Sequence, residues 1–215
     1  MRSQHRYYPV LLRLNGQKCL VVGGGAVALR KAASLREAGA RVRVVRPEFC
    51  APFKRMKGVA RQRRRYRRSD LKGCALVISA TDDPAVNRRV AREAMAAGVP
   101  VNVVDQPALC SFIVPGSFRR GRLTVTVSTD GTSPALSGMI RRQLAQLFGA
   151  EYARLLAALA AARPEAMRRI ANPRLRRQIL QKLASPEILK LAKRSSARTV
   201  RQAMLALIRS AAKKD

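Results

Sequence analysis

The feature that most constrains the fold of this chain is a glycine-rich turn between an apolar run and a helical pattern. Residues 18–22 (KCLVV) have the composition of a short buried strand, and residues 26–38 carry the pattern of a helix. The turn reads Gly23-x-Gly25-x-x-Ala28. In such a unit the first glycine permits a tight turn, the second lets backbone approach a pyrophosphate, and the small third residue allows close helix–strand packing. The sequence therefore predicts a dinucleotide site with its phosphates at the helix N-terminus.

Strands and helices continue to alternate over the first half of the chain. The run at 74–80 (CALVISA) is apolar throughout, as expected of a strand buried on both faces. Apolar patterns predict further strands at 42–45 and 99–104 and a helix at 84–97. This alternation predicts an α/β domain built on a parallel, doubly wound sheet.

The pattern changes after about residue 113. Two strands are predicted at 111–115 and 122–128, and a helix at 134–148 carries an apolar stripe of Leu136, Met139, Ile140, Leu144 and Leu147. From residue 150 onward the chain is rich in Ala, Leu and Arg and helical throughout, punctuated by Pro164, Pro173 and Pro186. These changes predict three parts, namely residues 1–113, 114–149 and 150–215.

Composition excludes several classes of protein. Hydrophobic residues make up 47% of the chain, too many for a protein disordered throughout. No run of about 18 apolar residues is present, and the N-terminus lacks the features of a signal peptide, so we expect a soluble cytoplasmic protein without a membrane partner. His5 is the only histidine and the four cysteines lack zinc-ligand spacing, so no metal site is expected.

The charge balance indicates an anionic partner. The chain has 44 Lys and Arg against 12 Asp and Glu, a net charge of +32. Such a charge is typical of nucleic-acid binding proteins and also of enzymes for strongly anionic substrates. No recognised nucleic-acid motif accompanies it, so a specific nucleic-acid partner is not expected.

The end of the second predicted strand leaves the choice of dinucleotide open. An acidic residue that binds the ribose hydroxyls of NAD is expected about 20 residues beyond the glycines, whereas an arginine nearby accommodates the 2′-phosphate of NADP. This chain has Arg46-Pro47-Glu48 there. Arg46 favours a 2′-phosphate, and Glu48 is close enough along the chain to reach ribose hydroxyls.

Polar residues that are candidates for ligand contacts follow two further predicted strands. Thr81, Asp82 and Asn87 follow the strand at 74–80, at the edge where a doubly wound sheet binds its ligands. Asp83 precedes Pro84 and is interpreted as a helix N-cap.

The next strand ends with Asn102 and Asp105. A carboxylate there is a candidate general base or acid, and the alternative for Asp105 is a turn residue before Pro107.

The segment STDGTSP at 128–134 allows two interpretations. Its hydroxyls and backbone N–H groups suit the carboxylates of an anionic ligand, and Ser133 equally suits the N-cap of the following helix. The residues concerned are Ser128, Thr129, Gly131, Thr132 and Ser133.

Several of these motifs occur together in one order: VVGGGAVALRKAASLREAGARVRVV, VISATDDPAVN, VNVVDQP and SFIVPGSFRRGRLTVTVSTDGTSPAL. Over about residues 7–148 the chain resembles the precorrin-2 dehydrogenases, the stand-alone relatives of the N-terminal half of siroheme synthase. The resemblance implies a Rossmann-type domain, a small α+β dimerisation region and a C-terminal helical domain. It also implies a homodimeric enzyme that oxidises precorrin-2, a tetrapyrrole, to sirohydrochlorin with NAD.

The same resemblance assigns roles to residues. It ties Asp105 to catalysis and maps cofactor contacts onto Ala26, Val27, Pro47 and Glu48, with Arg46 as a surface or pyrophosphate-side cation. Gly23, Gly25, Thr81 and Asp82 complete the expected cofactor site, and Asn102 joins the 128–133 hydroxyls as the expected substrate site. Ferrochelatase activity stays open, and the alternative function is a non-catalytic module that senses NAD.

Overall fold

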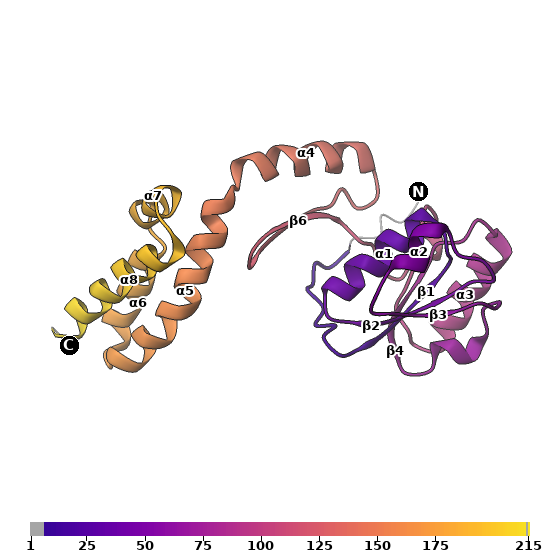
Figure 1. Ribbon diagram of the computed structural model, residues 1–215, viewed down its shortest axis with the longest axis horizontal. Coiled ribbons are helices and arrows are strands. Elements are labelled where there is room, and N and C mark those ends of the chain that lie inside the picture. The colour runs from indigo at the N-terminus through magenta and orange to yellow at the C-terminus, as the bar shows by residue number, and fades with distance from the viewer. Residues whose placement is uncertain (1–6, 214) are drawn as a thin grey trace. The chain divides into compact units, whose positions relative to one another are not determined.

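The computed structural model describes residues 7–213 and 215, and the chain forms two compact units, one ending at Val114 and the other beginning at Pro115. His5 lies outside the described residues. The first unit, drawn from indigo to purple in Figure 1, contains a five-stranded parallel sheet with strand order β3-β2-β1-β4-β5. Its strands are β1 (Lys18–Val22), β2 (Arg41–Val45), β3 (Val59–Gln62), β4 (Cys74–Ser79) and β5 (Val101–Val103).

Helices cover both faces of this sheet because alternate side chains of each strand point to opposite faces. Cys19 and Val21 pack on one face with α1 (Ala26–Glu37) and α2 (Ala51–Arg55). Leu20 and Val22 pack on the other with α3 (Pro84–Ala96). Two short 3-10 turns, η1 (Arg68–Leu71) and η2 (Pro107–Leu109), complete the unit. This is the doubly wound, Rossmann-type α/β fold that the sequence predicts.

The strand register places three loop starts together. Val22 at the end of β1 pairs with Val45 at the end of β2 and with Ser79 at the end of β4. The loops that follow these strands therefore begin side by side at the carboxyl edge of the sheet, where such folds bind ligands.

The second unit begins with an antiparallel ribbon and continues as helices. The ribbon pairs β6 (Gly116–Arg120) with β7 (Leu123–Val127), and α4 (Pro134–Leu147) contacts both strands. Leu155, Ile170, Leu183, Val200 and Met204 belong to the core shared by the last four helices. Those helices are α5 (Ala150–Arg169), α6 (Pro173–Leu183), α7 (Pro186–Arg194) and α8 (Ala197–Ala212).

Two local predictions are wrong. Residues 111–115 form no strand, because Ser111 and Phe112 turn back to donate hydrogen bonds to the Val101 carbonyl, and the strand begins at Gly116 instead. Pro164 does not interrupt the helical zone, since α5 runs through it. Pro164 lies on the exposed side of α5, where water can replace the missing backbone hydrogen bond, while Ala162 and Ala166 anchor the helix in the core.

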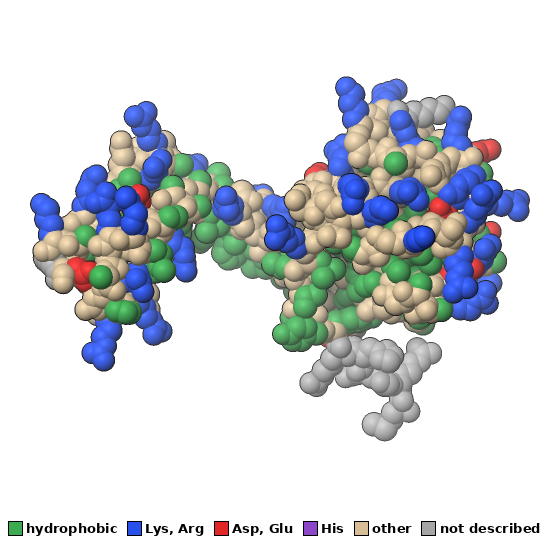
Figure 2. Space-filling view, turned by 90° about the horizontal axis from the view of Figure 1, so that it is seen from below, with side chains coloured by type: hydrophobic (Ala, Val, Ile, Leu, Met, Phe, Trp, Pro, Cys, Tyr) green, Lys and Arg blue, Asp and Glu red, His purple; other side chains and the backbone are tan. Residues whose placement is uncertain are grey.

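The charged side chains on the surface seen in Figure 2 are mostly basic. Figure 2 shows Lys and Arg over much of the visible face of each unit, with few acidic side chains among them. No helix in the described part of the chain is long and apolar enough to cross a membrane. The division of the chain at residues 113 and 149 stays a prediction.

Candidate functional site

A cavity of about 550 Å³ opens at the carboxyl edge of the parallel sheet. Its walls come from the loops after β1, β2 and β4, whose starts the strand register brings together, and from the loop after β5, a strand whose last residue Val103 pairs with Ser79 of β4. The lining residues are Gly24, Gly25, Ala26, Val27, Arg46, Glu48, Phe49, Cys50, Ala80, Thr81, Asp82, Val104 and Asp105.

The glycine turn forms one wall, and its three glycines differ in how close the neighbouring atoms lie. Gly23 has φ +135°, and a Cβ there would lie 2.2 Å from the Ala80 carbonyl oxygen. A Cβ at Gly24 would lie 2.5 Å from the Glu48 carbonyl oxygen. A Cβ at Gly25 would meet no protein atom within 4 Å, so Gly25 faces open space in the cavity wall.

Helix α1 begins at this wall without a side-chain cap. Gly25 is its N-cap residue, and within the described residues no side chain bonds to the first backbone N–H groups of the helix. The first N–H groups of any helix lack intrahelical partners. Those of Ala26 and Val27, which both line the cavity, are therefore available to an anionic ligand.

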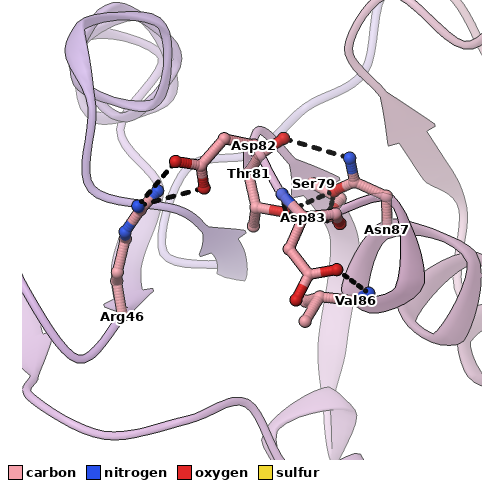
Figure 3. A network of polar contacts seen from close by, with 7 residues as sticks. All are labelled: Arg46, Ser79, Thr81, Asp82, Asp83, Val86 and Asn87. Atoms are coloured by element: carbon pink, nitrogen blue, oxygen red, sulfur yellow. Dashed lines mark hydrogen bonds and ion pairs between the residues drawn. The ribbon is translucent and has the colours of Figure 1, made fainter.

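Arg46 and Asp82, which both line the cavity, form an ion pair. Arg46 follows β2 and Asp82 follows β4, on either side of β1 in the sheet. The Nη2 atom of Arg46 lies 3.0 Å from Oδ1 of Asp82 and donates a 3.2 Å hydrogen bond to its Oδ2 (Figure 3). A hydrogen bond from Arg46 lowers the pKa of the exposed Asp82 carboxyl.

A buried amide holds the loop that carries Asp82. The Oδ1 atom of Asn87 accepts hydrogen bonds from Ser79 Oγ at 2.7 Å and Thr81 Oγ1 at 2.9 Å, and its Nδ2 donates to the Thr81 carbonyl at 3.0 Å (Figure 3). Asp83 then caps α3 by accepting from the N–H groups of Ala85 and Val86, as the sequence predicts. Asn87 therefore holds the loop from inside the protein and does not line the cavity.

Asp105 reaches the cavity from the loop after β5. Its backbone lies in the left-handed region at φ +59°, which Asp tolerates better than most residues. On the neighbouring helix α1, Lys31 is half-buried. Burial lowers the pKa of Lys31, the charge of Arg30 lowers it further, and the nearby Asp105 carboxylate opposes both.

Asn102 and Cys110 close the loop that carries Asp105. Asn102 is buried, and its Nδ2 donates to the Phe112 carbonyl at 3.0 Å. The thiol of Cys110 accepts from the Val103 N–H at 3.1 Å and lies 3.2 Å from the Val103 carbonyl oxygen. Burial raises the pKa of Cys110, which favours the protonated thiol in this role.

The predicted hydroxyl segment lies in the second unit, between β7 and α4, and its side chains bond to their own loop. Ser133 Oγ caps α4 by accepting from the Leu136 N–H at 3.2 Å, as one of the two readings predicts. Thr129 Oγ1 accepts from the Ser133 N–H at 3.0 Å, and Ser128 Oγ accepts from the Asp130 N–H at 3.1 Å. Gly131 has φ +80°, and the Thr132 N–H donates to the Thr129 carbonyl, which tightens the turn.

The structure thus brings most of the predicted first-unit residues to one cavity. Gly23 underlies the turn, Asn102 lies inside the protein, and neither these two nor Pro47 lines the cavity. Prediction from sequence missed Gly24, Phe49, Cys50, Ala80 and Val104. For Gly24 a signal was present, because it is the middle residue of three consecutive glycines.

Comparison with known families finds two matches along the chain. Residues 10–116 match a family described as "Putative NAD(P)-binding", and residues 120–147 match one described as "Sirohaem biosynthesis protein central". Siroheme synthase of Thioalkalivibrio sulfidiphilus (strain HL-EbGR7) is 40% identical over 188 residues. Siroheme synthase of Pseudomonas putida (strain W619) is 48% identical over 158 residues.

The chain is a homologue of the siroheme synthases. Those two alignments cover 86% and 72% of this chain but only 38% and 34% of the relatives, so the chain spans well under half of their length. Among solved structures, "SirC, precorrin-2 dehydrogenase" superimposes with a TM-score of 0.76 at 26% identity, over 95% of this chain and all of that one. These findings confirm the resemblance identified from the sequence.

Proposed function

We propose that this chain catalyses the NAD-dependent dehydrogenation of precorrin-2 to sirohydrochlorin, an oxidoreductase step of siroheme biosynthesis, in the cytoplasm. The observation that carries the proposal is the meeting of the glycine turn and the Asp105 carboxylate in one cavity. The siroheme synthase relatives and the precorrin-2 dehydrogenase with a similar fold support it.

The residues around the cavity fit a dinucleotide. Open space at Gly25 and the unpaired N–H groups of Ala26 and Val27 suit a pyrophosphate. Bound NAD would supply the hydride acceptor for the oxidation. The proposed cofactor site comprises Gly23, Gly25, Ala26, Val27, Arg46, Pro47, Glu48, Thr81 and Asp82, with Gly23 acting through the shape of the turn.

Asp105 is the proposed acid–base residue. Loss of a hydride from the macrocycle must be accompanied by loss of a proton, and the Asp105 carboxylate lies on the cavity wall where it can accept that proton. Lys31 on α1 places a positive charge near this carboxylate.

The substrate carries several carboxylates, and the chain carries a net charge of +32, so long-range attraction favours their encounter. For the substrate site we propose the turn at Ser128, Thr129, Gly131, Thr132 and Ser133. The hydroxyls of Ser128, Thr132 and Ser133 donate no hydrogen bond within the described residues, so they can donate to carboxylates. Asn102, which is buried, would contribute by holding the Asp105 loop.

We further propose that the chain works as a homodimer built around residues 115–149. No side chain of this segment is buried within its own chain, although β7 and α4 are rich in apolar residues. Leu136, Met139 and Leu147 are 44%, 43% and 70% exposed. A contiguous apolar surface of this kind marks a protein–protein contact, and a symmetric second copy is the simplest partner.

An anaerobic assay tests the proposed reaction. The protein is mixed with precorrin-2 and NAD, and sirohydrochlorin is followed by its absorption. Asp105→Asn should lower turnover by about 10²–10⁴-fold while leaving the affinity for NAD unchanged, because the amide tolerates the same backbone but cannot accept the proton. Unchanged turnover in this variant would contradict the role of Asp105.

Two additions to the assay separate the remaining functions. Added Fe²⁺ or Co²⁺ should consume sirohydrochlorin faster than a protein-free metal control if the chain also acts as a chelatase. A protein that binds NAD but oxidises no precorrin-2, with NAD or NADP, would instead be the non-catalytic NAD sensor.

A further inference from the structure

At the position after β2 where dinucleotide-binding folds contact the adenosine ribose, this chain has an arginine. Arg46 is the first residue after β2, the position at which an acidic residue binds the ribose hydroxyls of NAD and an arginine accommodates the 2′-phosphate of NADP. Its side chain lines the cavity, and its Cδ atom lies 3.0 Å from where a Cβ at Gly24 would be. The side chain therefore extends along the glycine turn.

Asp82 occupies only part of this guanidinium. Both contacts from its carboxylate go to the same Nη2 atom, and Nε and Nη1 of Arg46 donate to no other residue in the described part of the chain. A guanidinium offers five N–H donors in a planar fork that suits a phosphate. Most of the binding capacity of Arg46 is therefore unused while it is paired with Asp82.

The ion pair is also easy to open. The Asp82 side chain is 80% exposed, and ion pairs open to solvent contribute little to stability. Because Asn87 fixes the loop that carries Asp82, the longer and more flexible Arg46 side chain is the partner that moves. A phosphate carries more charge and more acceptor oxygens than a carboxylate, so it can compete for the guanidinium.

We propose that Arg46 is the residue through which this cleft recognises the 2′-phosphate of a dinucleotide, exchanging Asp82 for that phosphate, so that the chain binds NADP⁺ as well as NAD⁺. Glu48 lines the same cavity and leaves a carboxylate for the ribose hydroxyls of NAD⁺. This proposal rests on the dinucleotide site of the proposed function and extends it to a second cofactor.

Calorimetric titrations with NAD⁺ and NADP⁺ test it, because the two probes differ only in the 2′-phosphate. Arg46→Ala should raise the Kd for NADP⁺ by at least about tenfold more than it raises the Kd for NAD⁺, because only NADP⁺ loses charge-assisted hydrogen bonds to a 2′-phosphate. Arg46→Lys should retain part of the NADP⁺ affinity, since it keeps the charge and loses the fork. Asp82→Asn should strengthen NADP⁺ binding, and this gain should vanish in the Arg46→Ala background.

Arg88→Ala and Glu37→Gln are matched charge controls. Both residues are exposed on helices of the same unit and lie outside the cavity lining, and their side chains have no hydrogen bond or ion pair within the described residues. Each should leave both affinities unchanged. Melting temperatures equal to that of the wild type would show that the Arg46 and Asp82 variants are folded.

Three results would overturn the proposal. If Arg46→Ala weakened NAD⁺ and NADP⁺ equally, Arg46 would contact the pyrophosphate. If it weakened neither, Arg46 would have no part in binding. If the wild type bound NAD⁺ but not NADP⁺, the inference would fail while the proposed function stood, whereas binding of neither dinucleotide would refute both.

Discussion

At the scale of single residues, backbone conformation and side-chain chemistry coincide at the cavity. Asp105 and Asp130 are the two non-glycine residues with positive φ among those the structure describes, and Asp105 lines the cavity. A left-handed backbone costs about 1–2 kcal/mol at an ordinary residue, and Asp lowers this cost by bonding locally. The turn thus directs the Asp105 carboxylate to the cavity wall and lowers the free energy of unfolding only slightly.

The glycines provide a test that separates folding from binding. Gly23→Ala should destabilise the protein by more than about 3 kcal/mol, because its Cβ would overlap the Ala80 carbonyl in a backbone region closed to alanine. Gly25→Ala should leave the free energy of unfolding nearly unchanged, because its Cβ meets no protein atom, yet weaken dinucleotide binding.

Urea unfolding and NAD titration of both glycine variants make this measurement. A stable Gly25→Ala protein with wild-type affinity for NAD would show that the dinucleotide does not approach this turn.

At the scale of elements, the loops after β4 and β5 are each held by a buried asparagine, Asn87 and Asn102. Each amide donates to a backbone carbonyl of the loop that it holds. Rigid loops of this kind keep polar side chains at the cavity in a preorganised geometry. The Cys110 thiol adds a second tie to the Asp105 loop.

Cys110 should therefore affect turnover more than cofactor binding. Cys110→Ala removes the thiol from the Val103 backbone, and we expect turnover to fall by about 2–10-fold, the equivalent of one ordinary hydrogen bond, with NAD affinity unchanged. Cys110→Ser should restore much of the turnover because it offers a hydroxyl in place of the thiol. If the Ala and Ser variants behaved alike, the hydrogen bonds of Cys110 would have no role in positioning.

The junction of β3 and η1 should be sensitive to acid. Asp70 is buried and accepts hydrogen bonds from the Arg64 guanidinium at 2.5 and 2.8 Å. Burial alone would raise the pKa of Asp70, but the bonds from Arg64 and from the Arg67 N–H outweigh it, so the pKa is lowered. Because the unfolded pKa is about 3.9, this stabilisation is present above about pH 4 and is lost as the pH falls through the lower folded pKa.

Asp70→Asn should accordingly cost about 3 kcal/mol at neutral pH, since it removes the carboxylate that pairs with Arg64. The deficit relative to wild type should shrink below about pH 4. Denaturant unfolding at pH 7 and at pH 3 measures both values, and Glu37→Gln is the exposed control. A deficit that does not depend on pH would rule out the ion pair as its source.

At the scale of the whole molecule, the apolar surface of residues 115–149 calls for a partner. Sedimentation should show a dimer at micromolar concentration, and Leu147→Glu should dissociate it by burying a charge in the contact. Met167→Glu is the matched control, because Met167 is an exposed apolar residue on α5, outside this segment. A monomeric wild type, or a dimer untouched by Leu147→Glu, would contradict the proposed interface.

Local sequence patterns were enough to predict the fold class and the edge of the sheet at which the cavity opens. Strand composition, glycine spacing and helix caps such as Asp83 are local signals, and local signals suffice for the alternating α/β pattern and for its ligand-binding edge. Which side chains meet across the sheet depends on the tertiary structure. Arg46 pairs with Asp82, 36 positions away, because the register of β1 brings the ends of β2 and β4 together.

The same reason explains the departures from the predicted pattern. Asn102 points inward because the Phe112 carbonyl returns beside it, and α5 continues through Pro164 because its other face is anchored in the helical core. Both outcomes depend on contacts between distant segments, which no local pattern of residues encodes.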